Sequence, residues 1–95
     1  MSRRYAEQLG AALAELYWRD PDAMLTGTAL LRRELGDEYR VRETFEGGAQ
    51  VIGHGCAMQV SRALVCSAEN LPPRERRQKV RSIARYVSRS LRRQP

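Results

Sequence analysis

Residues 39–52, YRVRETFEGGAQVI, decide the fold class of this chain. From Tyr39 to Glu46 the side chains alternate between two sides, which is the period of a half-buried β-strand. Gly47-Gly48 is a turn signal, and residues 49–52 form the expected return strand. On both sides of this hairpin, apolar residues recur at helical spacing instead. The sequence therefore predicts an α+β domain in which helices flank a β-hairpin.

The register of this hairpin depends on which side chains face each other. A two-residue loop, Gly47-Gly48, sets Phe45 opposite Gln50. A three-residue loop, 47–49, sets Phe45 opposite Val51 and keeps apolar side chains together. We therefore expect the three-residue loop.

The segment 56–68 fits two structures. One is a helix whose core-facing residues are Val60, Ala63, Leu64 and Ser67. The other is a third strand, which would extend the hairpin to a three-stranded antiparallel sheet. The frequent alanine favours the helix slightly, and both interpretations stay open.

Two N-terminal helices are expected before the hairpin. The first covers residues 3–18, with Ser2 as its cap and an apolar series made of Tyr5, Leu9, Ala12, Leu13 and Leu16. The second follows at residues 23–35 and ends at Gly36, which favours the left-handed conformation that closes helices. Because the connection at Arg19-Asp20 is short, we expect the two helices to pack as an antiparallel pair.

The start of the second helix has its own signals. Asp20 can accept hydrogen bonds from the free amides, and Pro21 suits the first helical position. Gly27 weakens a helix interior, so the helix can begin as late as Thr26 or Thr28.

The last helix is the most distinctive element. Pro72-Pro73 breaks the chain, and a basic amphipathic helix is expected from Pro73 to Arg92, with a frayed tail at residues 93–95. Its apolar residues share one side: Val80, Ile83, Ala84, Val87 and Leu91. An arc of about 120° on the other side holds Arg74, Arg77, Arg81, Arg85, Arg89 and Arg92.

Charge is concentrated in this helix. The chain carries a net charge of +6, whereas residues 71–95 alone carry +8 and the preceding 70 residues sum to −2. Arginines four positions apart repel each other, so the pattern predicts an anionic partner. We expect DNA or RNA, bound through phosphates by a small regulatory protein, because the helix has no aromatic residue except Tyr86, at about 180° from Arg77, and base stacking is not indicated.

Other partners stay open. Glu34, Asp37 and Glu38 can neutralise the arginines internally and leave an ordinary solvated face. An acidic protein is another partner, in which case the chain is a protein-interaction module such as an inhibitor or adaptor. A membrane partner is not expected, because the apolar side of the last helix lacks Trp and Phe. An exposed Tyr17-Trp18 patch would favour a homodimer.

Candidate chemistry is confined to His54 and Cys56. If Cys56 opens a helix, the free amides and the nearby imidazole stabilise its thiolate, and Cys56 is a reactive thiol. With Cys66 these residues supply at most three zinc ligands, at spacings unlike those of zinc fingers. We expect no metal site, no cofactor, no catalytic residues and no enzymatic activity.

Two resemblances accompany these residues. Gly53-His54-Gly55-Cys56-Ala57 resembles the glycine–cysteine corner of iron–sulfur scaffold proteins of the NifU type, which implies an iron–sulfur role for Cys56; the family's other cluster ligands have no match. If 56–65 is a strand, the order helix, three strands, helix is similar to that of double-stranded-RNA-binding domains. The Ser-Lys-Lys start of that family's last helix is replaced here by Leu71-Pro72-Pro73-Arg74.

Length and composition limit the class of protein. The 95 residues suit one small domain, with 42% hydrophobic residues. No apolar run approaches the roughly 20 residues that span a bilayer, and Glu7, Gln8 and Glu15 interrupt any signal-peptide core. We expect a cytoplasmic protein whose two cysteines are free thiols.

Overall fold

A three-stranded antiparallel sheet in the order β1-β2-β3 forms one layer of the protein in a computed structural model, which describes residues 2–93. The strands are β1 (Arg40–Glu43), β2 (Ala49–Gly53) and β3 (Cys56–Val60). The predicted α+β class is confirmed, and the sheet has the third strand that the sequence left open.

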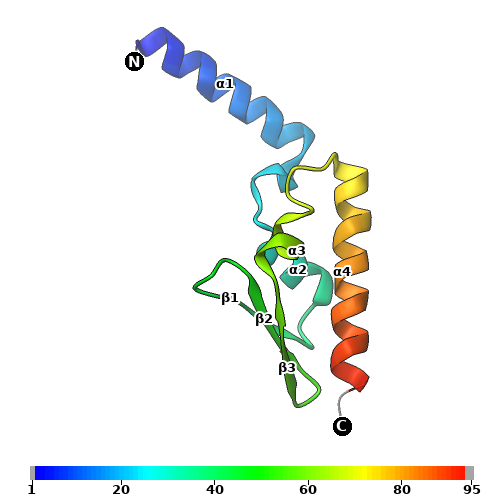
Figure 1. The fold of residues 1–95 in the computed structure, drawn as a ribbon. Coiled ribbons are helices and arrows are strands. Elements are labelled where there is room, and N and C mark those ends of the chain that lie inside the picture. Colours follow the sequence, from blue (N-terminus) through cyan, green and yellow to red (C-terminus); the bar gives the residue numbers. More distant parts are fainter. Residues whose placement is uncertain (1, 94–95) are drawn as a thin grey trace.

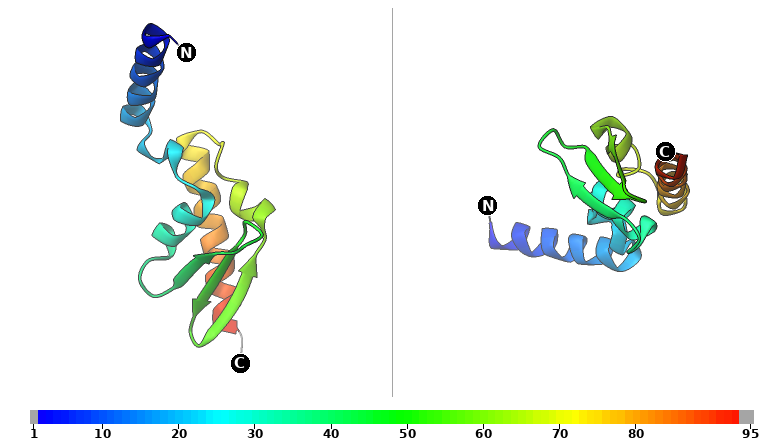
Figure 2. Two further views of the ribbon diagram at one scale, coloured as in Figure 1. Left: turned by 90° about the vertical axis from the view of Figure 1, so that its left-hand side faces the viewer. Right: turned by 90° about the horizontal axis from the view of Figure 1, so that it is seen from below.

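The helices are α1 (Arg3–Arg19), a 3-10 turn η1 (Pro21–Met24), α2 (Gly27–Leu35), α3 (Arg62–Cys66) and α4 (Pro73–Arg93). Helices α2 and α4 lie on one side of the sheet, whereas α1 extends away from it (Figure 1). Seen from the sheet side, α4 runs behind the strands (Figure 2, left). The molecule is accordingly elongated, with extents of 59 × 28 × 22 Å.

The core lies between the sheet and the helices. Alternation along β2 places Ala49 and Val51 inside, where Val51 and Leu91 are among the largest fully buried side chains. The main cluster draws on both layers and comprises Leu31, Tyr39, Val41, Ala49, Val51, Val60, Val65, Ile83, Ala84, Val87 and Leu91. Burial of this apolar surface is the main stabilising contribution, at about 25 cal/mol per Å².

The register of the β1–β2 hairpin differs from the prediction. Val41, and not Phe45, lies opposite Val51, and Phe45 is fully exposed in the connection, with 107% relative exposure. Thr44 closes the turn one residue before Phe45, because its amide donates to Gly48 O and its hydroxyl accepts from the amide of Gly48. The expected three-residue loop is therefore wrong, and the connection runs from Thr44 to Gly48.

Tyr39 supports this register from the other end of β1. A Cβ atom on Gly53 would lie 2.4 Å from the ring of Tyr39, so only glycine leaves room for that ring. The observed pairing keeps Tyr39 and Val41 in the core, which the predicted register would not do.

Residues 56–68 combine the two predicted structures. Cys56–Val60 is a strand, so the predicted helix is wrong in this half, because β2 offers a full set of backbone partners. Ser61 then caps α3 by accepting a hydrogen bond from the amide of Leu64 at 3.2 Å. The helix is correct only for Arg62–Cys66.

The start of α2 also differs in detail. Thr26 is its cap and Gly27 its first residue, within the predicted limits, and Gly36 ends it with φ 75°. Asp20 does not cap the following turn as predicted. Its carboxylate instead pairs with the guanidinium of Arg76, a side chain of α4 that is buried with 4% relative exposure.

Helix α1 does not pack against α2, so the predicted antiparallel pair is wrong. Ser2 caps α1 as expected, accepting from the amide of Tyr5 at 3.1 Å, but no residue of α1 is buried. The reason lies at Asp20, where the pair with Arg76 and the turn η1 direct α1 away from the sheet (Figure 1).

Gly27 brings α2 and α3 into close contact. A Cβ atom at this position would lie 1.9 Å from the carbonyl oxygen of Val65. The amide of Gly27 also donates to the carboxylate of Glu69 at 2.6 Å. The glycine that weakens the helical pattern in the sequence is thus required by the packing.

The predicted frayed tail falls at the edge of the described residues. Arg93 is the last residue of α4, and residues 94 and 95 lie outside the residues that the structure describes.

We expect Gly27→Ala to lower the free energy of unfolding by about 1–3 kcal/mol, because the added methyl overlaps a backbone carbonyl. Gly10→Ala in α1 is the control, since nothing lies within 4 Å of its Cβ position. It should raise helicity without lowering stability. Urea unfolding followed by circular dichroism measures both, and a Gly27→Ala variant as stable as the parent would contradict the packing argument.

We expect Asp20→Ala to cost about 3 kcal/mol, because it leaves the Arg76 guanidinium buried without its carboxylate. Asp22→Ala removes a more exposed pair with Arg33 and should cost less than about 1 kcal/mol. The double variant Asp20→Ala/Arg76→Met should recover part of the loss. Equal costs for Asp20→Ala and Asp22→Ala would show that burial of the pair is unimportant.

Candidate nucleic-acid interface

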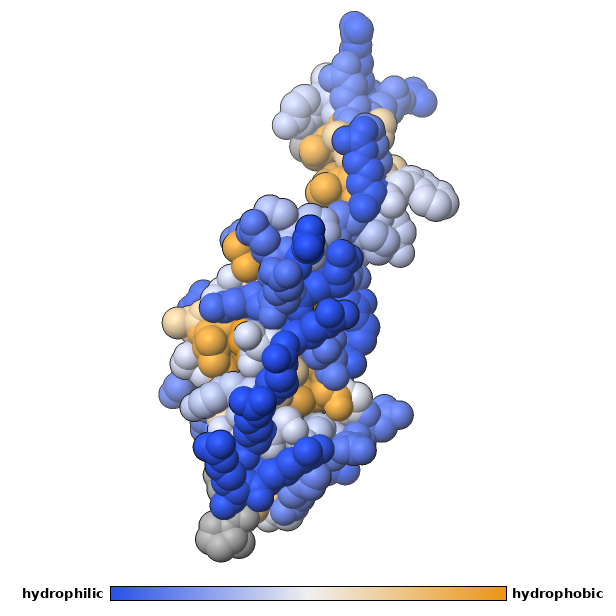
Figure 3. Space-filling model, turned by 90° about the vertical axis from the view of Figure 1, so that its right-hand side faces the viewer, coloured by the Kyte–Doolittle hydropathy of each residue, from blue (hydrophilic) through white to orange (hydrophobic). Residues whose placement is uncertain are grey.

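Helix α4 has one buried side and one charged side. The residues that it buries are Arg76, Val80, Ile83, Ala84, Val87 and Leu91. The six residues predicted to contact phosphates are all exposed, and we call them the arginine stripe: Arg74, Arg77, Arg81, Arg85, Arg89 and Arg92. Figure 3 shows strongly hydrophilic side chains in a nearly continuous row along the outer side of α4.

The arginine stripe is almost free of internal ion pairs. Arg81 lies 3.7 Å from Glu34, but the two side chains are 60% and 41% exposed, so the pair contributes at most about 1 kcal/mol. Within residues 2–93, the other five arginines of the stripe make no ion pair, and neither do Asp37 and Glu38. Of the three acids considered as internal partners, only Glu34 therefore reaches the stripe.

Two other arginines are, in contrast, paired with the chain's own carboxylates. Arg76 is paired with Asp20 in a buried site. Arg33 donates to both carboxylate oxygens of Asp22 at 2.9 and 2.6 Å. Asp20 and Asp22, which precede α2, are thus engaged by arginines outside the stripe.

The Asp22 carboxylate shows the effect of these cations. The hydrogen bonds from Arg33 are the largest cause that lowers the pKa of Asp22 from its ordinary value of 3.8, while burial acts in the opposite direction. The charges of Arg33, Arg76 and Arg77 add to the lowering. The same pair raises the pKa of Arg33.

Two hollows are each lined by more than one arginine of the stripe. One groove of about 390 Å³ lies between α2 and α4, where Arg81, Arg85 and Arg92 face Glu34 and Glu38. A second hollow of about 290 Å³ is lined by α4 alone, through Ser82, Arg85, Tyr86, Arg89, Ser90 and Arg93. Every residue of the second hollow carries a hydrogen-bond donor and none is acidic, which suits an anion. Arg85 lines both hollows.

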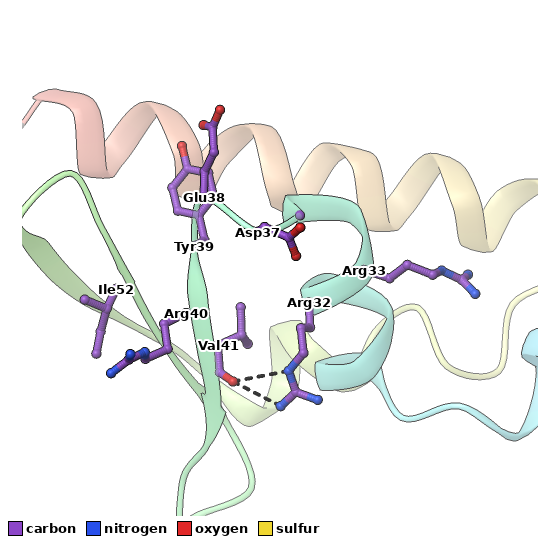
Figure 4. A pocket seen from close by; sticks show the side chains of 9 residues that line it. Arg32, Arg33, Asp37, Glu38, Tyr39, Arg40, Val41 and Ile52 are labelled. Carbon is purple, nitrogen blue, oxygen red and sulfur yellow. Dashed lines mark hydrogen bonds between the residues drawn. The ribbon is translucent and has the colours of Figure 1, made fainter.

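Another hollow, of about 660 Å³, lies between α2 and β1 (Figure 4). Arg32 donates there to the carbonyl oxygen of Val41 at 3.0 and 3.3 Å. Figure 4 shows Arg33 and Arg40 pointing away from one another, and the lining includes two acids, Asp37 and Glu38. Its divergent cations and mixed charge make it a poorer anion site than the stripe.

The His54–Cys56 segment does not have the predicted geometry. Cys56 is the first residue of a strand, so no helix N-terminus stabilises its thiolate, and it packs partly buried against the core. His54 lies in the β2–β3 turn, where its Nε2 shares a 2.8 Å hydrogen bond with the hydroxyl of Tyr39. That hydroxyl also bonds to Ser88 of α4 at 2.8 Å. His54 therefore joins the turn to α4.

Both cysteines are free in the structure. Within residues 2–93, no group of three or more histidine, cysteine or carboxylate side chains is arranged to hold a metal ion. In the same residues, no helix combines the length and the apolarity needed to cross a bilayer.

Sequence reasoning missed the burial of Arg76 and the Tyr39–His54–Ser88 contacts. The position of Arg76 was a usable signal, since on a helical wheel it falls among the apolar residues of α4. No comparable signal links Tyr39 to Ser88, which are 49 positions apart.

No protein-family model, no curated protein and no solved structure matches this chain. The order of elements from α2 to α4 is helix, three strands, short helix, helix. Apart from α3, this is the order that the sequence suggested by analogy with double-stranded-RNA-binding domains.

We expect the Asp22–Arg33 pair to stabilise the protein at neutral pH and to lose this effect as the pH falls through 3.8 and below. The folded pKa is the lower one, so the unfolded chain takes up the proton first and acid favours unfolding. Urea unfolding of the parent and of Asp22→Asn should show a stability difference at pH 7 that shrinks at pH values near 3. A constant difference would contradict the assignment, and Asp37→Asn controls for the loss of one carboxylate.

Proposed function

We propose that the chain is a small regulatory protein that binds nucleic acid through the sugar–phosphate backbone, with the arginine stripe of α4 as its contact surface. One observation carries the proposal: six exposed arginines share one face of a helix, while Arg33 and Arg76 are paired with the chain's own carboxylates. The fold leaves most of these guanidinium groups available to an outside anion.

Electrostatics support a partner with many closely spaced charges. Arginines four positions apart repel by a few tenths of a kcal/mol per pair, so the stripe does not stabilise α4 by itself. Bound phosphates attract the arginines and so offset the repulsion among them. A guanidinium can also donate two parallel hydrogen bonds to one phosphate.

The geometry of α4 favours backbone contact over base reading. Its 21 residues extend about 31 Å, and arginines four residues apart are separated by about 6 Å along the axis. A row of this kind follows a charged backbone and does not converge on a single base. Tyr86 is the only aromatic side chain of α4, so the stripe offers little base stacking.

The proposal is tested by titrating labelled duplex DNA and duplex RNA with the protein at several salt concentrations. If the six arginines each meet one phosphate, the logarithm of the binding constant should fall by about 5 per decade of salt on duplex DNA. Arg81→Gln/Arg85→Gln should weaken binding and reduce that slope by about 2.

The matched control is Arg40→Gln/Arg62→Gln, which removes two exposed arginines from β1 and α3. It lowers the net charge equally but should leave the slope nearly unchanged. Equal losses in both double variants, or no binding at about 50 mM salt, would overturn the proposal. Displacement of the nucleic acid by polyglutamate at low concentration would favour an acidic protein partner instead.

A further inference from the structure

Helix α1 presents an apolar face that none of the described residues 2–93 covers. It extends from the body of the molecule (Figures 1 and 2), and none of its 17 residues is buried. Tyr5, Leu9, Leu13 and Leu16 are 43–55% exposed, and Trp18 at its end is 84% exposed. Apolar side chains are open to solvent on the projecting helix in Figure 3. We call Tyr5, Ala6, Leu9, Ala12, Leu13 and Leu16 the α1 stripe.

Local interactions alone give α1 little stability. An isolated helix of about 12–15 residues or fewer is marginal in water, and α1 is only slightly longer. The Ser2 cap and the pairs Arg3–Glu7 and Glu15–Arg19 favour it, each by about 1 kcal/mol or less. Gly10 in the middle of the helix destabilises it by about 1 kcal/mol, which offsets roughly one of these contributions. A surface that packs against the α1 stripe would stabilise this helix further.

We propose that the α1 stripe is a dimer interface, and that α1 of a second copy of this chain packs against it in the antiparallel direction. This inference is independent of the nucleic-acid proposal, because it uses a different helix and a different kind of surface.

The spacing of the stripe suits such a pair. Tyr5, Leu9, Ala12 and Leu16 are separated by four, three and four positions, which is the heptad spacing of helices that pack along their length. In one antiparallel register, Leu9 of each copy faces Ala12 of the other, and Tyr5 faces Leu16. Large side chains then meet small ones at the centre, and Ala6 and Leu13 widen the contact on one flank.

The charge of Arg19 favours the antiparallel direction of the two α1 helices. In a parallel pair the two Arg19 side chains, which continue the heptad spacing after Leu16, would face each other. In the antiparallel register, Arg19 of each copy faces Ser2 of the other. The antiparallel arrangement also sends the two bodies to opposite ends, which reduces repulsion between chains that each carry +6.

The area is sufficient for a specific contact. Covering the stripe on both copies, with Tyr17 at its end, removes on the order of 1,000 Å² from water, which is where specific interfaces begin. An unrelated partner could use the same stripe, but the self-complementary register and charges favour a second copy.

The test is the oligomeric state of the nuclease-treated full chain, measured by analytical ultracentrifugation at about 0.5 M salt, where nucleic acid cannot bridge two copies. We expect twice the mass of one chain. Leu9→Gln/Leu16→Gln should raise the dimer dissociation constant by about 100-fold or more. The body should stay folded by circular dichroism, because α1 is not part of the core.

The control is Ala11→Gln/Ala14→Gln, which places the same side chains on the opposite side of α1 and should leave the dimer intact. A parent chain that is monomeric at all concentrations, or equal dissociation of both variants, overturns the proposal. Binding of the monomer to anionic lipid vesicles would assign the stripe to a membrane surface instead, and would also overturn it.

The direction is tested separately with a spin label at Arg4→Cys in a Cys56→Ser/Cys66→Ser background. In the proposed register the two labels are separated by about 20 Å along the helix axes. A parallel pair would bring them within about 10 Å. The short distance would overturn the antiparallel arrangement while leaving the dimer itself in place.

Discussion

Asp20 and Arg76 are 56 positions apart in the sequence and meet where α1 ends and α4 begins. Arg76 is buried, so its charge requires the carboxylate, and the carboxylate holds the chain at the point where α1 leaves the body. Because α4 is a rigid helix, turning Arg76 inward also turns the arginine stripe outward. The ion pair thus joins the end of α1 to the start of α4, and two unlike faces stay open, one apolar on α1 and one basic on α4.

The parts of the fold that follow from local pattern could be predicted from the sequence. The alternation of side chains with a period of two residues predicted the strands β1 and β2. A helical wheel correctly separated the buried and the charged side of α4. The register failed at Phe45 because hydrogen bonds of Thr44 close the turn, which an apolar pattern does not show. The direction of α1 failed because an amphipathic helix reveals that it has an apolar face but not what covers that face.

The candidate site was predictable to a similar degree. The wheel predicted which arginines share one side of α4, and those six are exposed in the structure. It could not show that Asp22 and Asp20 engage Arg33 and Arg76, since those pairs join separate elements. The Cys56 hypothesis depended on a helix beginning at that residue, and pairing with β2 made the segment a strand. Long-range pairing overrode a weak local preference there.

The position of Trp18 has a practical consequence for spectroscopy. It is the only tryptophan of the chain, and it lies at the end of α1, outside the core. Its fluorescence therefore reports the surroundings of α1 and says little about the integrity of the sheet and α4. The four tyrosines are divided, with Tyr5 and Tyr17 in α1 and Tyr39 and Tyr86 in the body. Tryptophan emission thus selects the projecting helix, whereas tyrosine emission comes from both parts.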